Sequence, residues 1–319
     1  MHTPVDLKAP IFIAGHRGMV GSSIWHELEQ RGAGQLIGAT HAELELRDTN
    51  AVEKFFAEHK PTYVVLAAAK VGGIQANINA PADFLYDNLA IQNSIYAAAL
   101  KHGVKKILFL GTSCIYPREC PQPMKEEYLL TGPLEPTNEG YALAKIAGIK
   151  LAEYMYKQHG LQSVCPMPPN LYGPNDNFDP KNSHVLAALV RKFVTAVDAK
   201  ADVETMWGSG TARREFMHVD DVARIAVDLF NEHETPEIIN IGPGIDSSIK
   251  ELAELVAKLT GYTGPLHWDT TKPDGMPRKC LDVSRMRKLG LGPTITLEDG
   301  IKEMITYFRK KQLDELART

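Results

Sequence analysis

The chain has 319 residues, of which 44% are apolar and 23% charged, ordinary values for a soluble globular protein with one large or two moderate domains. The formal net charge of −4 supplies no basic field for nucleic acid, and no run of about 18 uncharged apolar residues indicates a membrane span. The opening residues, MHTPVDLKAP, lack the apolar segment of a secretory signal. The four cysteines form no CxxC pair and no zinc-site spacing; they are Cys114, Cys120, Cys165 and Cys280. We therefore expect a cytoplasmic protein with free thiols and with no metal, nucleic-acid or membrane partner.

Apolar runs alternate with helical patterns over roughly the first half of the chain. The expected strands cover residues 9–15, 35–40, 62–69 and 105–111, and the expected helices cover residues 23–32, 50–60, 81–103 and 137–160. This alternation predicts an α/β fold, a Rossmann-type doubly wound parallel sheet. Such sheets bind ligands at the carboxyl ends of their strands.

After this region the pattern becomes mixed. The expected elements are a Pro- and Asn-rich loop over 168–182, a helix over 183–197, a strand over 237–242 and a helix over 251–261. We expect a Rossmann domain that binds the cofactor, made of residues 1–174 and about 215–245. A smaller mixed α/β lobe, made of residues 175–214 and 246–319, would bind the substrate.

A glycine-rich motif follows the first expected strand. Residues 15–21 read GHRGMVG and open a helix. Glycines let the backbone approach a pyrophosphate closely, and a helix N-terminus favours its negative charge. The motif and its position predict a dinucleotide site, although a tight strand-to-helix turn without a ligand would use the same residues.

The end of the second strand distinguishes NAD from NADP. A carboxylate there would bind the ribose 2′-hydroxyl of NAD, but residues 38–41 read GATH and the first carboxylate is Glu43. Arg17, inside the glycine loop, could meet the 2′-phosphate of NADP. We therefore favour NADP(H), with a solvated surface arginine as the alternative for Arg17.

Tyr141 and Lys145 are four residues apart in YALAK, so they share one face of the expected helix. A lysine ammonium beside a phenol stabilises the phenolate, so we expect Lys145 to lower the pKa of Tyr141 and prepare it for proton transfer to or from a carbonyl. A solvated Tyr/Lys pair is the common alternative, and the nearby glycine loop argues against it.

The segment GTSCIYP (111–117) follows the fourth strand. If the extended geometry continues past Gly111, alternation places Thr112 and Cys114 on one side and Ser113 on the other. Thr112 would then be the hydroxyl that hydrogen-bonds a substrate carbonyl, with the Cys114 thiol beside it. The alternative for Cys114 is a small buried apolar residue.

Together these motifs resemble the extended short-chain dehydrogenase/reductases that act on nucleotide sugars. The resemblance runs from about residue 10 to 310 through GHRGMVGS, AAAKVGGIQAN, FLGTSCIYP, EPTNEGYALAKIAGIK, NLYGPNDNF, NSHVLAAL, WGSGTARREFMHVDD and TKPDGMPRK. It is closest to the branch that epimerises C3 and C5 of a GDP-linked 4-keto-6-deoxy sugar and then reduces C4 with NADPH.

The resemblance implies a role for five residues. Tyr141 would protonate the C4 oxygen, Lys145 would hold the nicotinamide ribose, and Thr112 would stand at the catalytic serine position. Cys114 and His184 would be the base and acid of epimerisation. The C4 ketone acidifies the protons at C3 and C5, and inverting a carbon needs proton removal on one face and return on the other. From spacing alone, His184 could instead be a surface residue of a helix capped by Asn182 or Ser183.

The resemblance also implies the binding residues. For the cofactor these are Gly15, His16, Arg17, Gly18, Met19, Val20, Gly21, Thr40, His41, Leu110, Gly111, Thr112, Ser113, Tyr141, Lys145, Pro168, Pro169, Asn170, Leu171 and His184. For the substrate they are Cys114, Asn170, Lys192, Trp207, Arg214 and Asp274. Trp207 could equally be a core residue, and Arg214 could pair with Glu215. Members of the family form homodimers through the two long helices of the first domain, so we expect a homodimer.

Three positions depart from the family pattern: Gly140 before the tyrosine, Pro169 in PPN and Asp179 in NFDPKN. They affect the shape of the sugar pocket, so another GDP-linked keto sugar, such as a heptose, is an alternative substrate. A 4-epimerase, a simple 4-reductase and an NADP(H)-binding regulator without chemistry are the other functions that the motifs leave open.

Overall fold

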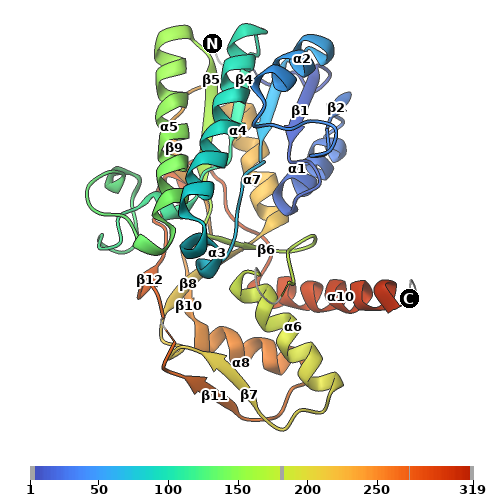
Figure 1. Cartoon of the computed structure of the whole chain (residues 1–319), viewed down its shortest axis with the longest axis vertical. Coiled ribbons are helices and arrows are strands. Elements are labelled where there is room, and N and C mark those ends of the chain that lie inside the picture. The colour runs from blue at the N-terminus through green and yellow to red at the C-terminus, as the bar shows by residue number, and fades with distance from the viewer. Residues whose placement is uncertain (1–3, 180–182, 273, 317–319) are drawn as a thin grey trace.

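A six-stranded sheet forms the larger part of the protein. The computed structural model describes residues 4–179, 183–272 and 274–316. The sheet has the order β2-β1-β3-β4-β5-β9, and each neighbouring pair is parallel (Figure 1). Its strands are β1 (Pro10–Ala14), β2 (Gln35–Ile37), β3 (Tyr63–Leu66), β4 (Lys106–Phe109), β5 (Gln162–Met167) and β9 (Ile238–Asn240). The predicted Rossmann-type doubly wound sheet is confirmed.

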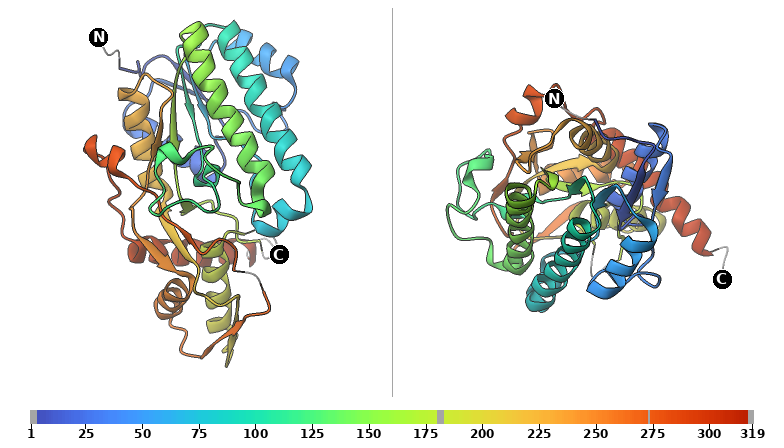
Figure 2. Two further views of the ribbon diagram at one scale, coloured as in Figure 1. Left: turned by 90° about the vertical axis from the view of Figure 1, so that its left-hand side faces the viewer. Right: turned by 90° about the horizontal axis from the view of Figure 1, so that it is seen from above.

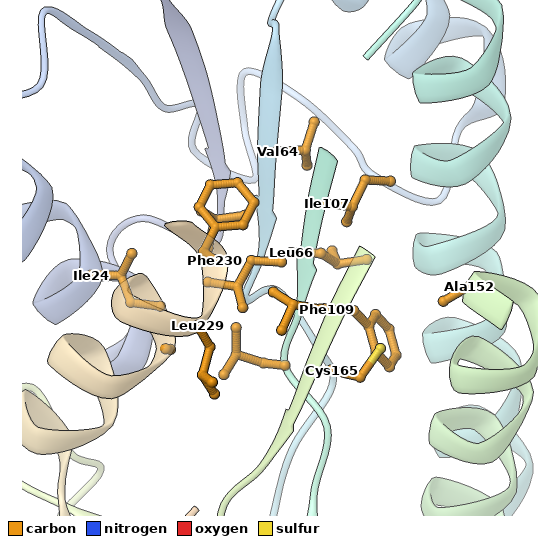
Figure 3. Packing of buried hydrophobic residues seen from close by; sticks show 14 of the residues in the cluster. Ile24, Val64, Leu66, Ile107, Phe109, Ala152, Cys165, Leu229 and Phe230 are labelled. Atoms are coloured by element: carbon orange, nitrogen blue, oxygen red, sulfur yellow. The ribbon is translucent and has the colours of Figure 1, made fainter. Parts of the chain in front are cut away.

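Helices cover both faces of this sheet, which explains why its strands are apolar throughout. On one face α1 (Met19–Gln30) packs against α7 (Val219–Glu232). The other face carries α2 (Thr49–His59), α4 (Pro81–Lys101) and α5 (Glu139–His159) (Figures 1 and 2). Figure 3 shows the core between them, with Ile24, Leu229 and Phe230 on the α1/α7 side of Val64, Leu66, Ile107, Phe109 and Cys165, and Ala152 of α5 beyond.

The strand order reverses beside β1, because β2 lies on one side of it and β3 on the other. In open α/β sheets ligands bind at such a switch point, outside the carboxyl ends of the strands. The glycine-rich loop after β1 stands at this position. The fold therefore places the predicted dinucleotide loop where a dinucleotide is expected.

The second part of the protein lies below the carboxyl ends of the parallel strands in Figure 1. Strand β8 (Arg213–His218) pairs with β6 (Asn170–Tyr172), β10 (Asp246–Ser248) and β12 (Arg278–Lys279), and β7 (Glu204–Trp207) pairs with β11 (Leu266–Asp269). A second cluster of buried apolar side chains lies among α6 (Val185–Asp198), α8 (Ile249–Thr260) and α10 (Leu297–Leu316). The short elements are α3 (Ile74–Asn79), α9 (Ser284–Lys288) and the single 3₁₀ turns η1 (Ser113–Ile115), η2 (Glu126–Tyr128) and η3 (Pro136–Asn138).

Several elements differ from the sequence-based expectation. β5 is absent from the predicted strands because Pro166 interrupts its apolar run, yet it occupies a place between β4 and β9. β6 falls within the predicted loop 168–182, where pairing with β8 overrides local composition. α1 begins at Met19, earlier than predicted, directly on the glycine loop. No helix in the described part of the chain is long and apolar enough to cross a membrane.

Candidate active site

The glycine loop is built for close backbone approach. Gly15 has φ +87°, a conformation that favours glycine, and the Gly18 N–H donates a hydrogen bond of 2.9 Å to the Gly15 carbonyl. A Cβ at Gly21 would lie 2.1 Å from the Gly15 oxygen, so only glycine lets α1 start against the loop. No side chain caps α1 at Gly18. Its first N–H groups therefore remain available for an anion.

A carboxylate lies near the end of β2, although in the sequence Glu43 comes several residues after the strand. Glu43 turns back and accepts hydrogen bonds from Thr40, at 2.7 Å from N and 2.8 Å from Oγ1. These bonds, and then the charge of Arg17, lower the pKa of Glu43. Arg17 is thus a cation close to this strand end, whereas the exposed His41 pairs with Glu45 at 3.1 Å.

His16 is packed between the loop and the sheet. A Cβ at Gly38 would meet the His16 ring at 2.5 Å, and the Trp25 ring centroid is 5.6 Å from that of His16. Burial, and then the charge of Arg17, lower the pKa of His16. A neutral His16 therefore fills the gap beside the glycine loop.

Thr112 and Cys114 come together through a turn and not through strand alternation. β4 ends at Phe109, and after the extended Thr112 the chain enters η1. The Cys114 N–H donates to Thr112 Oγ1 at 3.2 Å. The Ser113 N–H donates to the Pro168 carbonyl at 3.0 Å, and its side chain is buried. Extended geometry therefore continues past Gly111 to Thr112 but ends there, so strand alternation is not the reason why Thr112 and Cys114 lie side by side.

Tyr141 and Lys145 extend from α5 towards the same strand end. Lys145 Nζ lies 5.9 Å from the centroid of the Tyr141 ring and donates a 2.7 Å hydrogen bond to the Leu110 carbonyl. Burial, and then the negative charge of Cys114, raise the pKa of Tyr141, while a hydrogen bond with Thr112 lowers it. The prediction that Lys145 lowers the pKa of Tyr141 is therefore wrong for this structure, in which burial prevails and the phenol is neutral.

The lysine of this pair is itself perturbed. Lys145 is 4% exposed. Burial lowers its pKa to about 8, and a nearby Cys165 raises it slightly in return. Its ammonium also lies 4.9 Å from the centre of the Phe109 ring. Lys145 is thus held rigidly between α5 and β4.

Cys114 has two polar partners that the sequence analysis did not identify. Asn138 Nδ2 donates to its Sγ at 3.2 Å, and Lys279 Nζ lies 3.5 Å from the same atom. Burial by itself would raise the pKa of this thiol, but Lys279, Thr112 and Asn138 together lower it below its ordinary value. The alternative of Cys114 as a small apolar residue does not fit these contacts. The only signal for Lys279 in the sequence is its place in the TKPDGMPRK block.

The end of β5 and the residues that follow it run beside the turn that holds Thr112. The Gly111 N–H donates to the Pro166 carbonyl at 3.0 Å, and a Cβ at Gly111 would overlap Met167. Asn170 Nδ2 donates to the Glu215 carbonyl at 3.1 Å. Leu110, Pro168, Pro169 and Leu171 are therefore carried by two chain segments that meet at the carboxyl edge of the sheet.

Three predicted substrate residues gather on the second part of the protein. Trp207 is 59% exposed at the end of β7, so the core alternative is wrong, and Lys272 Nζ lies 5.6 Å from its ring centroid. Asp274 accepts hydrogen bonds of 2.7 Å from both N and Oγ of Ser209. Burial lowers the pKa of Arg214. The charges of Cys114, Glu135 and Asp274 act in the opposite direction and raise it in part.

The alternative pairing of Arg214 with Glu215 does not occur. Successive residues of β8 point to opposite faces. Glu215 is fully buried and accepts hydrogen bonds from the Gly244 N–H at 2.6 Å and the Leu281 N–H at 2.8 Å. Arg214 instead interacts electrostatically with Cys114.

His184 and Lys192 lie on α6. His184 is the N-cap residue of this helix, its side chain is 42% exposed, and its Nδ1 is 3.6 Å from Asp176 Oδ1. Asn182, a capping alternative, lies outside the described residues. Lys192 Nζ donates to the Thr205 carbonyl at 2.8 Å and pairs with Glu204 at 3.2 Å. Both residues are near the surface and can reach a ligand.

Packing between two helices explains why glycine stands at position 140. A Cβ there would lie 2.6 Å from the Pro81 carbonyl oxygen, because the first turn of α5 packs against the start of α4. The departure at Gly140 therefore sets how closely these two helices approach beside Tyr141.

One group in the described part of the chain could bring three metal ligands together, namely His218, Asp220 and Glu303, within 4.8 Å of one another. His218 is buried, and its Nδ1 accepts a hydrogen bond from the Asp220 N–H at 3.3 Å as the N-cap of α7. One ring nitrogen is thus already used in capping. We assign no metal to this group.

The parallel sheet and the glycine loop at its switch point define a Rossmann-type protein of the extended short-chain dehydrogenase/reductase class. The family model for the NAD dependent epimerase/dehydratase family matches residues 11–242, and the chain belongs to this family. It is 52% identical to GDP-L-fucose synthase 1 of Arabidopsis thaliana, over 96% of this chain and 94% of that one. It is 51% identical to the GDP-L-fucose synthase of Escherichia coli, over 96% and 98%. A solved GDP-mannoheptose C4 reductase of Campylobacter jejuni with NADP bound is 36% identical, with a TM-score of 0.87 and coverage of 96% and 99%.

Proposed function

We propose that this protein converts GDP-4-keto-6-deoxy-D-mannose to GDP-L-fucose, by epimerisation at C3 and C5 and reduction at C4 with NADPH. The observation that carries the proposal is the Cys114 thiol. It has a lowered pKa, contacts Lys279 at 3.5 Å and lies next to Thr112 and Tyr141. A reductase needs the tyrosine, the lysine and the hydroxyl. A thiol prepared to lose its proton has no part in simple reduction.

The residues present fit a dinucleotide. The uncapped N-terminus of α1 and the space that a Cβ at Gly21 would fill suit a pyrophosphate, which residues 15–21 would hold. Arg17 would meet the 2′-phosphate near Thr40 and His41. Lys145 would hold the ribose, and residues 110–113 and 168–171, with His184, would border the nicotinamide. When bound, NADPH supplies the hydride that C4 receives.

For the reduction, the neutral phenol of Tyr141 is the useful form. Hydride addition at C4 turns the carbonyl oxygen into an alkoxide, which takes a proton from Tyr141. The hydrogen bond between Tyr141 and Thr112 orients the phenol, and Thr112 contacts the same oxygen. The raised pKa of Tyr141 keeps its proton in place until the alkoxide forms.

For the epimerisation, the Cys114 thiolate removes a proton from C3 or C5, and the electron pair of the C–H bond is delocalised onto the C4 oxygen. His184 returns a proton to the opposite face of the ring. Asp176 Oδ1 lies 3.6 Å from His184 Nδ1 and helps to orient the imidazole. The two steps restore the ketone with inverted configuration.

The substrate lobe would hold the GDP portion. Lys192 offers a cation for the diphosphate and Arg214 a second one beside Cys114. The exposed Trp207 would contact the nucleotide sugar, with Asp274 and Asn170 as hydrogen-bonding partners. The similarity to a GDP-mannoheptose C4 reductase supports one alternative, a 4-reductase of a GDP-linked heptose.

The test is turnover in heavy water with GDP-4-keto-6-deoxy-mannose and NADPH, followed by mass and NMR analysis of the product. We expect GDP-L-fucose with deuterium at C3 and C5. Cys114→Ser should lose the label, whereas Cys120→Ser, at a half-buried thiol outside the proposed site, should keep it. Reduction without label at either carbon, or turnover of a GDP-heptose alone, would refute the proposal.

The same proposal includes a homodimer in the cytoplasm. Helices α4 and α5 pack side by side and leave large apolar side chains exposed, among them Tyr86 at 71%, Tyr154 at 61% and Leu143 at 42%. A second copy of this pair would bury them. Light scattering during gel filtration should give twice the chain mass, and Tyr154→Lys should lower it; a monomeric wild type would contradict the dimer.

A further inference from the structure

The Cys114 thiol is surrounded by groups from four elements. Asn138 approaches from η3 at 3.2 Å and Lys279 from β12 at 3.5 Å. Tyr141 of α5 and Arg214 of β8 are the other titratable groups that interact with it. Tyr141 is neutral, so the two charged groups named here, Lys279 and Arg214, both present a cation to the thiol. Of these, Lys279 makes direct contact with the sulfur.

The fold holds Lys279 firmly in this position. β12 pairs in parallel with β8, and the register places Lys279 opposite Arg214. The two residues that follow are also anchored, because the Cys280 N–H donates to Gln122 Oε1 at 3.0 Å and the Leu281 N–H donates to the buried Glu215 at 2.8 Å. The backbone that carries Lys279 is thus fixed on both sides.

We propose that Lys279 is a positioning residue that keeps Cys114 as a thiolate in the resting enzyme, with Asn138 as its hydrogen-bonding partner. This makes Cys114 the base of epimerisation and leaves the acid role to His184. The catalytic meaning rests on the proposed function, whereas the state of the thiol does not. No role was assigned to Lys279 from the sequence.

The charge balance of the first step supports this assignment. The thiolate accepts the proton from C3 or C5 and becomes a neutral thiol, while the negative charge moves to the C4 oxygen. Lys279 loses its anionic partner only when the enolate forms. Without Lys279, burial would favour the neutral thiol, which cannot take a proton.

The test is the pH dependence of alkylation by iodoacetamide, read on the Cys114 and Cys120 peptides separately by mass spectrometry. The reaction follows the thiolate fraction. We expect Lys279→Gln to slow alkylation of Cys114 about tenfold at pH 7 and to move its pH profile upward. Lys279→Arg should restore the wild-type profile. Arg278→Gln is the matched control, because the Arg278 side chain pairs with Asp246 and not with Cys114.

Cys120 provides a comparison in the same digest: burial raises the pKa of its thiol and the charge of Lys279 offsets this only in part, so Lys279→Gln should slow its alkylation less than that of Cys114. A Cys114 profile that is the same in wild type and Lys279→Gln would overturn the proposal. If Lys279→Gln does not fold, the ultraviolet absorbance of the thiolate is titrated in the wild type and in Cys114→Ser, and the difference reports the Cys114 thiolate. Absence of that thiolate at pH 7 overturns the proposal. A shifted profile with unchanged deuterium incorporation would support the Lys279 contact and refute Cys114 as the base.

Discussion

Lys145 donates a 2.7 Å hydrogen bond from Nζ to the carbonyl of Leu110, which ties α5 to the carboxyl end of β4. The bond fixes the helix that carries Tyr141 against the turn that carries Thr112 and Cys114. Nζ lies 5.9 Å from the centroid of the Tyr141 ring, so the ammonium is near the phenol without being held by it. The residues proposed for reduction and for epimerisation thus share one support.

The Tyr141→Phe variant should separate the two halves of the reaction. Burial and Cys114 raise the pKa of Tyr141, so its phenol is a proton donor in the resting enzyme. Removing the hydroxyl should lower the rate of NADPH oxidation by about 10²-fold or more, because the C4 oxygen loses the proton donor proposed for it. Exchange of deuterium into the substrate should continue. Loss of both activities with an intact fold would argue that Tyr141 also takes part in enolisation.

The sheet and the glycine loop could be predicted because both depend on local patterns. Apolar runs, helical spacing and glycines before a helix are visible within windows of about 10–20 residues. The α5 pair Tyr141 and Lys145 was predictable for the same reason. β6 was missed because it is only three residues long and exists through pairing with β8.

The thiol contacts could not be predicted from such windows. Lys279 is 165 residues from Cys114 and Asn138 is 24 residues away, so only the tertiary fold brings them together. Glu43 reaches Thr40 because the chain turns, which a count along the strand does not reveal. The pKa of Tyr141 depends on burial, and its direction was predicted incorrectly for that reason.

The Arg17→Ala variant should change cofactor preference. Arg17 is close enough to Glu43 to lower the pKa of that carboxyl, and no other arginine lies in the loop. A lost charge-assisted bond is worth about 1.5–3 kcal/mol, so the KM for NADPH should rise about tenfold or more. The KM for NADH should change little. Arg309→Ala, on the exposed side of α10, is the control, and equal effects on both cofactors would exclude a 2′-phosphate contact.

The Gly140→Ala variant should loosen the site through packing. The new methyl group would lie 2.6 Å from the Pro81 carbonyl oxygen, which is backbone and cannot move aside cheaply. We expect a loss of about 1–3 kcal/mol in the free energy of unfolding, with a fall in kcat from displacement of Tyr141. Denaturant unfolding and steady-state assays measure both. Glu139→Ala, at the neighbouring exposed position, should leave the free energy of unfolding nearly unchanged. If Gly140→Ala also leaves it unchanged, a methyl group fits between α5 and α4 and the prediction is wrong.

The Lys106→Met variant should stabilise the protein. Lys106 is 2% exposed, its Nζ has no hydrogen-bond partner among the described residues, and it lies 5.7 Å from the centroid of the Phe230 ring. Burial lowers its pKa from 10.5 to about 8, an effect that Glu234 partly offsets. A charged, desolvated ammonium costs stability at neutral pH, so we expect a gain of about 1–2 kcal/mol at pH 7, discounted for the Glu234 charge.

The pH dependence of this gain identifies its cause. Between about pH 8 and 10.5 the unfolded chain keeps the Lys106 proton that the folded protein has lost, so wild-type stability rises with pH across this window. The advantage of Lys106→Met should therefore be largest below about pH 8 and shrink towards pH 10.5. Urea unfolding of both proteins at several pH values measures the difference. Lys105→Met, at the exposed neighbouring position, should show neither the gain nor its pH dependence, and a gain for Lys106→Met that does not vary with pH would assign it to apolar packing instead of charge burial.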